Sequence, residues 1–126
     1  MIFQYTWQKV LAGTKTQTRR VAKSSEELWT KEQDGPMPTK VIRRGNKVKW
    51  RTGGRYAVQP GRNQKGVGRI ELLDIRYQHL GNVTEEEARA EGFSSLAEFI
   101  KAWIKIHGRF DRELPVWVLE FRLLSS

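Results

Sequence analysis

The chain has 126 residues, a formal net charge of +9 and a pI of about 10.2. This length fits one domain with one modest core, and a hydrophobic content of 38% is enough to pack it. No run approaches the roughly 18 apolar residues of a membrane-spanning helix, and the absence of cysteine excludes disulfides and thiolate metal sites. We therefore expect a cytoplasmic protein with no membrane partner, no metal and no other cofactor.

The positive charge lies in the first half of the chain. Residues 1–66 hold 15 Lys and Arg against 4 Asp and Glu, which leaves a charge of +11. Residues 67–126 hold 8 Lys and Arg against 10 Asp and Glu, which leaves −2. This separation is typical of a basic face for a polyanion. The alternative is an ordinary solvated surface that happens to be basic.

The first 20 residues predict one short element and one polar segment. Residues 1–9 alternate loosely and fit either a strand or a short helix. Gly13 is typical of the position just after a helix, where a positive φ costs glycine little. The segment 13–20 carries no apolar side chain, so we expect it on a surface or in a cleft rather than in the core.

The middle of the chain predicts a weakly structured stretch followed by strands. Residues 21–40 show only a possible brief helix through Glu27 and Leu28, with chain-breaking residues at 34–38. A hairpin around Gly45-Asn46 is expected within 41–50, and strands are expected at 55–59 and 68–77.

The last third predicts two capped helices and a final strand. Thr84 with Glu87 and Ser95 with Glu98 are typical of capping boxes, and they open helices that end near Gly92 and Gly108. The second helix has an apolar stripe of Leu96, Phe99, Ile100, Trp103 and Ile106. A strand follows at 116–123, and Trp103 and Trp117 are expected in the core.

The segment Gly13-Thr14-Lys15-Thr16-Gln17-Thr18-Arg19-Arg20 resembles the Gly-x-Lys-x-x-x-x-Arg signature of ASCH domains, which are PUA-like barrels related to RNA-modification and coactivator proteins. The strands at 54–58 and 67–72, and the closing helices and strand, resemble the family's in the same order. The resemblance implies an α+β fold, a small PUA-like (ASCH) β-barrel with two or three flanking helices, as a single domain over 1–126. The chain departs from compact members by a basic insertion at about 21–51.

The resemblance also implies a site in a cleft between barrel and helices. One compact branch of the family hydrolyses N4-acetylcytidine to cytidine and acetate, and its catalytic Lys, Thr and Glu match Lys15, Thr18 and Glu71. A hydroxyl such as that of Thr18 needs a neighbouring base near neutral pH. Lys15 could serve if burial and nearby cations lower its pKa, and Glu71 could orient it or move a proton. Alternatively, Lys15 and Thr18 only contact phosphate and Glu71 pairs with Lys15.

Basic and aromatic residues together predict a nucleic-acid surface. Phosphate contacts give salt-sensitive affinity, and exposed aromatic rings stack on unpaired bases at about 1–3 kcal/mol each. RNA recognition usually uses such splayed bases, so we expect single-stranded or modified RNA, or a nucleoside, with DNA as the alternative. Trp50 and Tyr56 could equally be core. The expected nucleic-acid-binding residues are Arg19, Arg20, Arg43, Arg44, Lys47, Lys49, Trp50, Arg51, Arg55, Tyr56, Arg62, Lys65 and Arg69.

Three functions remain open on the sequence. The first is an RNA- or nucleotide-binding ASCH module, and the second is an amidohydrolase acting on N4-acetylcytidine. The third is a ribonuclease or a DNA- or partner-binding module. His79 and His107 are too isolated to predict a metal site, and no feature of the sequence indicates an oligomeric state.

Overall fold

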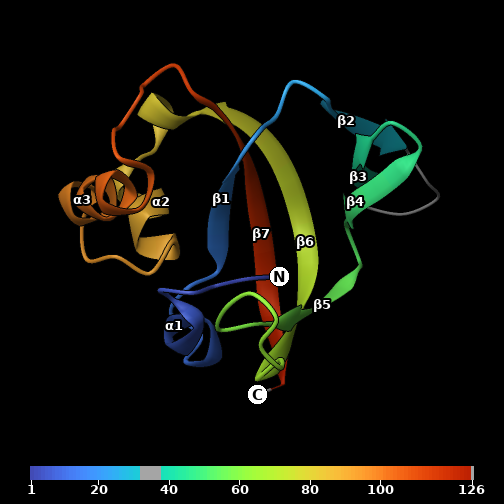
Figure 1. Ribbon diagram of the computed structural model, residues 1–126, viewed down its shortest axis with the longest axis horizontal. Helices are drawn as coiled ribbons and strands as arrows, with labels where there is room; N and C mark the ends of the chain where they lie inside the picture. Colours follow the sequence, from blue (N-terminus) through green and yellow to red (C-terminus); the bar gives the residue numbers. More distant parts are fainter. Residues whose placement is uncertain (32–37, 126) are drawn as a thin grey trace.

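The computed structural model describes residues 1–31 and 38–125. Within them the backbone forms a four-stranded and a three-stranded antiparallel sheet with three α-helices (Figure 1). The α+β class is therefore confirmed. The predicted barrel is not closed, because the strands form two separate sheets rather than one continuous ring.

The four-stranded sheet has the order β1-β7-β6-β5, with β1 at Gln17–Val21, β7 at Pro115–Ser125, β6 at Gly68–His79 and β5 at Arg55–Val58. Residues 116–119 of β7 are all buried. Val116 packs with residues of the helices, whereas Trp117 and Leu119 pack against the three-stranded sheet. Both faces of β7 are thus covered, and Trp117 is in the core as predicted.

The three-stranded sheet has the order β2-β3-β4, with β2 at Glu26–Lys31, β3 at Thr39–Arg44 and β4 at Lys47–Arg51. The predicted hairpin around Gly45 is confirmed, but the predicted helix through Glu27 and Leu28 is wrong. Leu28 packs against the core while Glu27 is exposed, and this period of two is that of a strand. Most of the predicted chain-breaking segment lies outside the described residues.

The helices are α1 (Trp7–Leu11), α2 (Glu85–Ala90) and α3 (Leu96–His107), with a 3₁₀ turn at Leu80–Asn82. Thr84 and Glu87 form the predicted reciprocal capping box, and Ser95 caps α3 by accepting from the Glu98 N–H. Phe99 and Trp103 are buried as predicted, but Ile106 is exposed because the last turn of α3 borders a pocket. No helix among the described residues is long and apolar enough to cross a membrane.

Figure 1 shows α2 and α3 beside β1, on one side of the long β6–β7 pair, and the three-stranded sheet on the other side. Glu26 joins this small sheet to β7. Its buried carboxylate accepts hydrogen bonds from Trp117 Nε1 at 3.0 Å and from Lys49 Nζ at 2.6 Å. Burial alone would raise the pKa of Glu26, but the hydrogen bonds from Lys49, Lys23 N–H and Trp117 outweigh it and hold the pKa below its ordinary value.

Glu26→Ala is expected to lower the free energy of unfolding by about 2–3 kcal/mol, because it leaves the Trp117 N–H buried and unpaired. In the wild type this stabilisation is complete above the ordinary glutamate pKa and is lost as pH falls through the lowered folded pKa. Urea unfolding at pH 7 and at lower pH measures both effects. The exposed neighbour Glu27→Ala is the control and should stay within about 0.5 kcal/mol; an equal loss in both variants would contradict this role.

Candidate functional site

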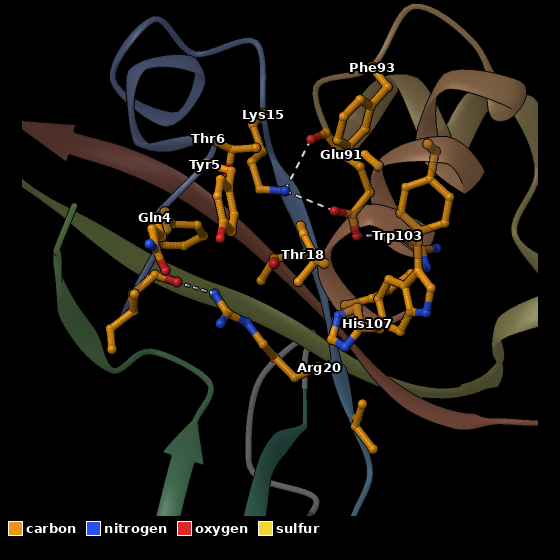
Figure 2. A pocket seen from close by; sticks show the side chains of 17 residues that line it. Gln4, Tyr5, Thr6, Lys15, Thr18, Arg20, Glu91, Phe93, Trp103 and His107 are labelled. Atoms are coloured by element: carbon orange, nitrogen blue, oxygen red, sulfur yellow. Dashed lines mark hydrogen bonds and ion pairs between the residues drawn. The ribbon is translucent and has the colours of Figure 1, made fainter. Parts of the chain in front are cut away.

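A pocket of about 270 Å³ opens between the N-terminal segment, β1 and α3 (Figure 2). Three short stretches contribute most of its wall: residues 2–6, residues 15–21 in and just before β1, and the last turns of α3. The remaining lining residues, Glu91 and Phe93, come directly after α2 in the chain. The lining residues are Ile2, Phe3, Gln4, Tyr5, Thr6, Lys15, Thr18, Arg19, Arg20, Val21, Glu91, Phe93, Phe99, Ala102, Trp103, Ile106 and His107.

Lys15 is almost fully buried, with only 4% of its surface exposed. Its ammonium donates to Glu91 Oε1 at 2.8 Å and to the Glu91 carbonyl oxygen at 3.0 Å (Figure 2). Burial lowers the pKa of Lys15, and the opposing effect of Glu91 does not fully restore it. The side chain is therefore a stronger base-catalyst candidate than a surface lysine, because less energy is needed to reach its neutral form.

Glu91 also holds the next cation along the signature segment. Its Oε2 accepts from Arg19 Nη1 at 3.0 Å, and Arg19 Nη2 donates to Glu87 at 2.7 Å. One carboxylate thus joins two buried cations of the segment to the end of α2. The segment was predicted on a surface or in a cleft, and Lys15, Thr18 and Arg19 do line the pocket. They are nevertheless largely buried. Burial of the two cations is possible because Glu87 and Glu91 compensate their charges.

The chain path around Glu91 explains this close contact. The Thr16 N–H donates to the Ala90 carbonyl at 2.7 Å, which ties the segment to the end of α2. Gly92 follows with φ +97, a conformation that favours glycine. A Cβ at Gly92 would lie 2.9 Å from the Lys9 side chain and 3.3 Å from Lys15 Cβ. Glycine therefore allows the chain to turn directly against Lys15.

Arg20 differs from the two cations before it, because no carboxylate of the described residues forms an ion pair with it. Its Nη2 donates to the Ile2 carbonyl at 2.7 Å, and its guanidinium lies 5.3 Å from the Phe3 ring centre. Its Nε is buried without a hydrogen-bond partner in the described structure. Burial lowers the pKa of Arg20 and Glu91 opposes this, but a guanidinium stays protonated at neutral pH. Of the three cations that line the pocket, Arg20 is therefore the one without a carboxylate partner among the described residues.

Aromatic side chains line the side of the pocket formed by α3 and the residues after α2. The imidazole of His107 stacks on Trp103, with ring centres 4.0 Å apart and planes 25° apart. Burial and the nearby Arg20 charge lower the pKa of His107, which keeps it neutral at pH 7. Phe93 and Phe99 continue this wall. A planar ring could pack against these groups while its polar edge faces Lys15 and Arg20 (Figure 2).

The structure brings together two of the three predicted catalytic residues. Lys15 and Thr18 both line the pocket, but Glu71 does not. Glu71 lies between the buried residues Ile70 and Leu72 of β6, so it faces away from the core and accepts from Arg122 Nε at 2.7 Å. The carboxylate beside Lys15 is Glu91. The prediction that Glu71 contacts Lys15 is therefore wrong. The alternation of apolar and polar residues along β6 already indicated that Glu71 points away from the core.

The predicted nucleic-acid-binding residues do not form one site. Arg19 is buried in ion pairs and Arg20 lines the pocket. Trp50 and Tyr56 are partly buried against the core. Arg43, Arg44, Lys47, Lys49 and Arg51 lie on the three-stranded sheet, with Lys49 paired to Glu26. The remaining residues of the prediction lie on β5, β6 or the loop between them: Arg55, Arg62, Lys65 and Arg69.

Several pocket residues were not predicted from the sequence as part of a site, among them Tyr5, Glu91 and Phe93. One sequence feature pointed to Glu91, which is its position just before Gly92, the glycine at which α2 was predicted to end. His107 was considered as a metal ligand, and its place in the pocket wall at the end of α3 was not predicted. Among residues 1–31 and 38–125, no three His, Asp or Glu side chains cluster closely enough to hold a metal ion.

No protein-family model and no curated protein matches this sequence. Solved structures do resemble it. A crystal structure of an ASCH domain from Lactobacillus crispatus JV V101 superimposes with a TM-score of 0.69 at 15% identity, covering 98% of this chain and 76% of that one. The chain has the ASCH fold. A DUF984 protein from Enterococcus faecalis V583 gives a TM-score of 0.59 at 17% identity, covering 94% of this chain and 66% of that one. In this ASCH fold the pocket residues Lys15, Thr18 and Arg20 all come from the segment that resembles the signature.

Glu91→Ala is expected to destabilise the fold by about 3–5 kcal/mol, because it leaves two buried cations without their shared partner. Glu86→Ala, an exposed residue in the first turn of α2, is the matched control and should cost at most about 1 kcal/mol. Thermal and urea unfolding measure the difference. Similar losses in the two variants would show that the buried network is not what holds the segment in place.

Proposed function

We propose that the chain binds a nucleotide, free or within single-stranded RNA, in the pocket beside Lys15 and Arg20. The observation that carries this proposal is the uncompensated Arg20 guanidinium within an otherwise compensated, partly aromatic pocket. The ASCH domain family is often linked to RNA binding, which is consistent with it.

The anionic part of the ligand is inferred from charge. Lys15 and Arg19 already have carboxylate partners, so they neither require nor strongly attract an anion. Arg20 is the cation of the pocket that gains most from one, since a guanidinium binds phosphate through paired donors. A phosphate at Arg20 would give this guanidinium the anionic partner that no described carboxylate provides.

The base is inferred from shape and lining. Nucleic-acid bases are planar, stack on aromatic or imidazole rings, and are distinguished by hydrogen bonds at their edges. The stacked Trp103 and His107 provide such a surface, and Lys15, Thr18 and Glu91 provide donors and acceptors in the same pocket. A volume of about 270 Å³ suits one small ligand rather than a duplex.

A second candidate function, hydrolysis of N4-acetylcytidine, is favoured by the lowered pKa of Lys15 beside Thr18. A neutral Lys15 would accept the Thr18 proton as the hydroxyl attacks the acetyl carbon, and would then return that proton to the departing cytosine nitrogen. Water would release acetate from Thr18 in a second step. Glu91 replaces Glu71 as the carboxylate that orients Lys15, because it is the one in contact.

For the binding function, wild-type protein is expected to bind cytidine 5′-monophosphate more tightly than cytidine. Arg20→Gln should weaken nucleotide binding by about tenfold or more and leave cytidine binding almost unchanged, because only the phosphate contact is lost. Isothermal titration calorimetry measures both ligands. Arg89→Gln, an exposed arginine of α2 outside the pocket, is the matched control. Equal nucleotide affinity in wild type and Arg20→Gln would refute the assignment.

For the hydrolase function, wild-type protein should release cytidine from N4-acetylcytidine, detected by chromatography. Lys15→Met should reduce the rate by about 10² or more, because it removes the base. Glu71→Gln should leave the rate unchanged, since that carboxylate is outside the pocket. The wild-type rate should rise as pH rises through the lowered Lys15 pKa, because only the neutral amine accepts a proton. Absence of cytidine, or an equal loss in Glu71→Gln, would exclude this mechanism.

A further inference from the structure

The three-stranded sheet has one side that packs on the core and one that does not. Leu28, Ile42 and Trp50 belong to the core side. Side chains alternate along a strand, so their neighbours point the opposite way. We define the outer face by Trp29, Val41, Arg43, Val48 and Arg51. The register aligns Trp29 with Val41 and Arg51, and aligns Arg43 with Val48.

An exposed tryptophan lies on the outer face. Trp29 keeps 52% of its surface accessible, which is unusual for so large an aromatic side chain. The guanidinium of Arg43 lies 5.1 Å from the Trp29 ring centre, and the indole N–H donates to Glu27 at 3.2 Å. The hydrogen bond is at the ring's edge and the guanidinium lies over the ring, so the indole is held in place while much of it stays open.

The cations of this sheet divide into two groups. Lys40 pairs with Asp74 at 2.8 Å and Lys49 pairs with Glu26 at 2.6 Å. The others form no ion pair with any described carboxylate, and they are Lys31, Arg43, Arg44, Lys47 and Arg51. Glu27 is the exposed acid among the described residues of the three strands. By the same alternation, Lys31, Arg43 and Arg51 lie on the side of Trp29 together with Glu27, whereas Arg44 and Lys47 lie on the opposite side. The open side therefore carries an excess of positive charge around one indole.

We propose that the outer face binds single-stranded nucleic acid, with a base stacked on Trp29 and the adjacent phosphates on Arg43 and Arg51. Exposed aromatic rings beside cations are the features that bind unpaired bases and their backbone. A duplex hides its base faces, so it could use the cations but not the indole. None of these residues lines the pocket, so this second site goes beyond the nucleotide site and does not depend on it.

This assignment replaces Trp50 with Trp29 as the stacking residue. Trp50 packs on the core side against Ile42, its register partner in β3, and Lys49 lies 4.5 Å from its ring centre. A base stacking on Trp50 would have to compete with this core packing and with Lys49 over the ring. Trp29, by contrast, is exposed.

The test is fluorescence anisotropy of the full chain with a labelled ten-nucleotide uridine RNA at several salt concentrations. Trp29→Ala should weaken binding about tenfold, and Trp29→Phe should retain most of the affinity because a ring can still stack. Trp29→Leu should behave like Trp29→Ala. Arg43→Gln with Arg51→Gln should weaken binding and make the log–log salt slope shallower by about 1.4, since two phosphate contacts are lost. Arg89→Gln with Lys101→Gln removes equal charge from α2 and α3 and should stay within about twofold.

Three outcomes would overturn the proposal. The first is unchanged RNA affinity in Trp29→Ala. The second is a matched RNA duplex that binds as tightly as the single strand and is equally sensitive to Trp29. The third is anionic lipid vesicles that bind with the same dependence on Trp29, which would assign the face to a membrane surface. Cytidine 5′-monophosphate binding should be unchanged in Trp29→Ala, so failure of this site and failure of the pocket proposal are distinguishable.

Discussion

The buried carboxylate of Glu91 is the constraint on which the site depends. It pairs with Lys15 and Arg19, two cations of a segment that is almost entirely polar. A buried ion pair contributes little net stability relative to an apolar pair, but removing one partner is costly. In this protein the main effect of the Glu91 network is to fix the positions of two elements. The network holds β1 against the end of α2, and the pocket forms where these two elements meet α3 and the N-terminal segment.

Glu26 has a comparable position on the other side of the long strands. It is a second buried carboxylate, and it links the three-stranded sheet to Trp117 of β7. Glu91 comes from the second half of the chain and contacts cations of the first half, whereas Glu26 comes from the first half and contacts Trp117 of the second. Glu87 and Glu91, from the acidic residues 67–126, neutralise Lys15 and Arg19, which are buried cations of residues 1–66. The charge separation along the chain is therefore not the charge distribution of the folded surface.

This neutralisation separates structural cations from available ones. Lys15, Arg19, Lys40 and Lys49 have acidic partners, whereas Arg20, Arg43 and Arg51 form no ion pair within residues 1–31 and 38–125. Arg20 lies at an aromatic pocket, and Arg43 and Arg51 lie around an exposed indole. Both places combine a guanidinium with an aromatic ring, and that combination is the physical basis for proposing two different contacts with nucleic acid.

The sequence by itself determined the elements with local signals: the capped helices α2 and α3, the hairpin at Gly45, the strands β5 to β7, and the segment that resembles the ASCH signature. Caps, turns and periodicity act over a few residues, so they can be read from the chain. Tertiary structure alone decided that Glu91 rather than Glu71 contacts Lys15, that Arg19 is buried, and that Trp29 rather than Trp50 is exposed. These outcomes depend on which face of a strand is covered and on partners as far as 76 residues away in sequence. The alternation of β6 indicates that Glu71 points away from Ile70 and Leu72, but no local pattern identifies the carboxylate that lies beside Lys15.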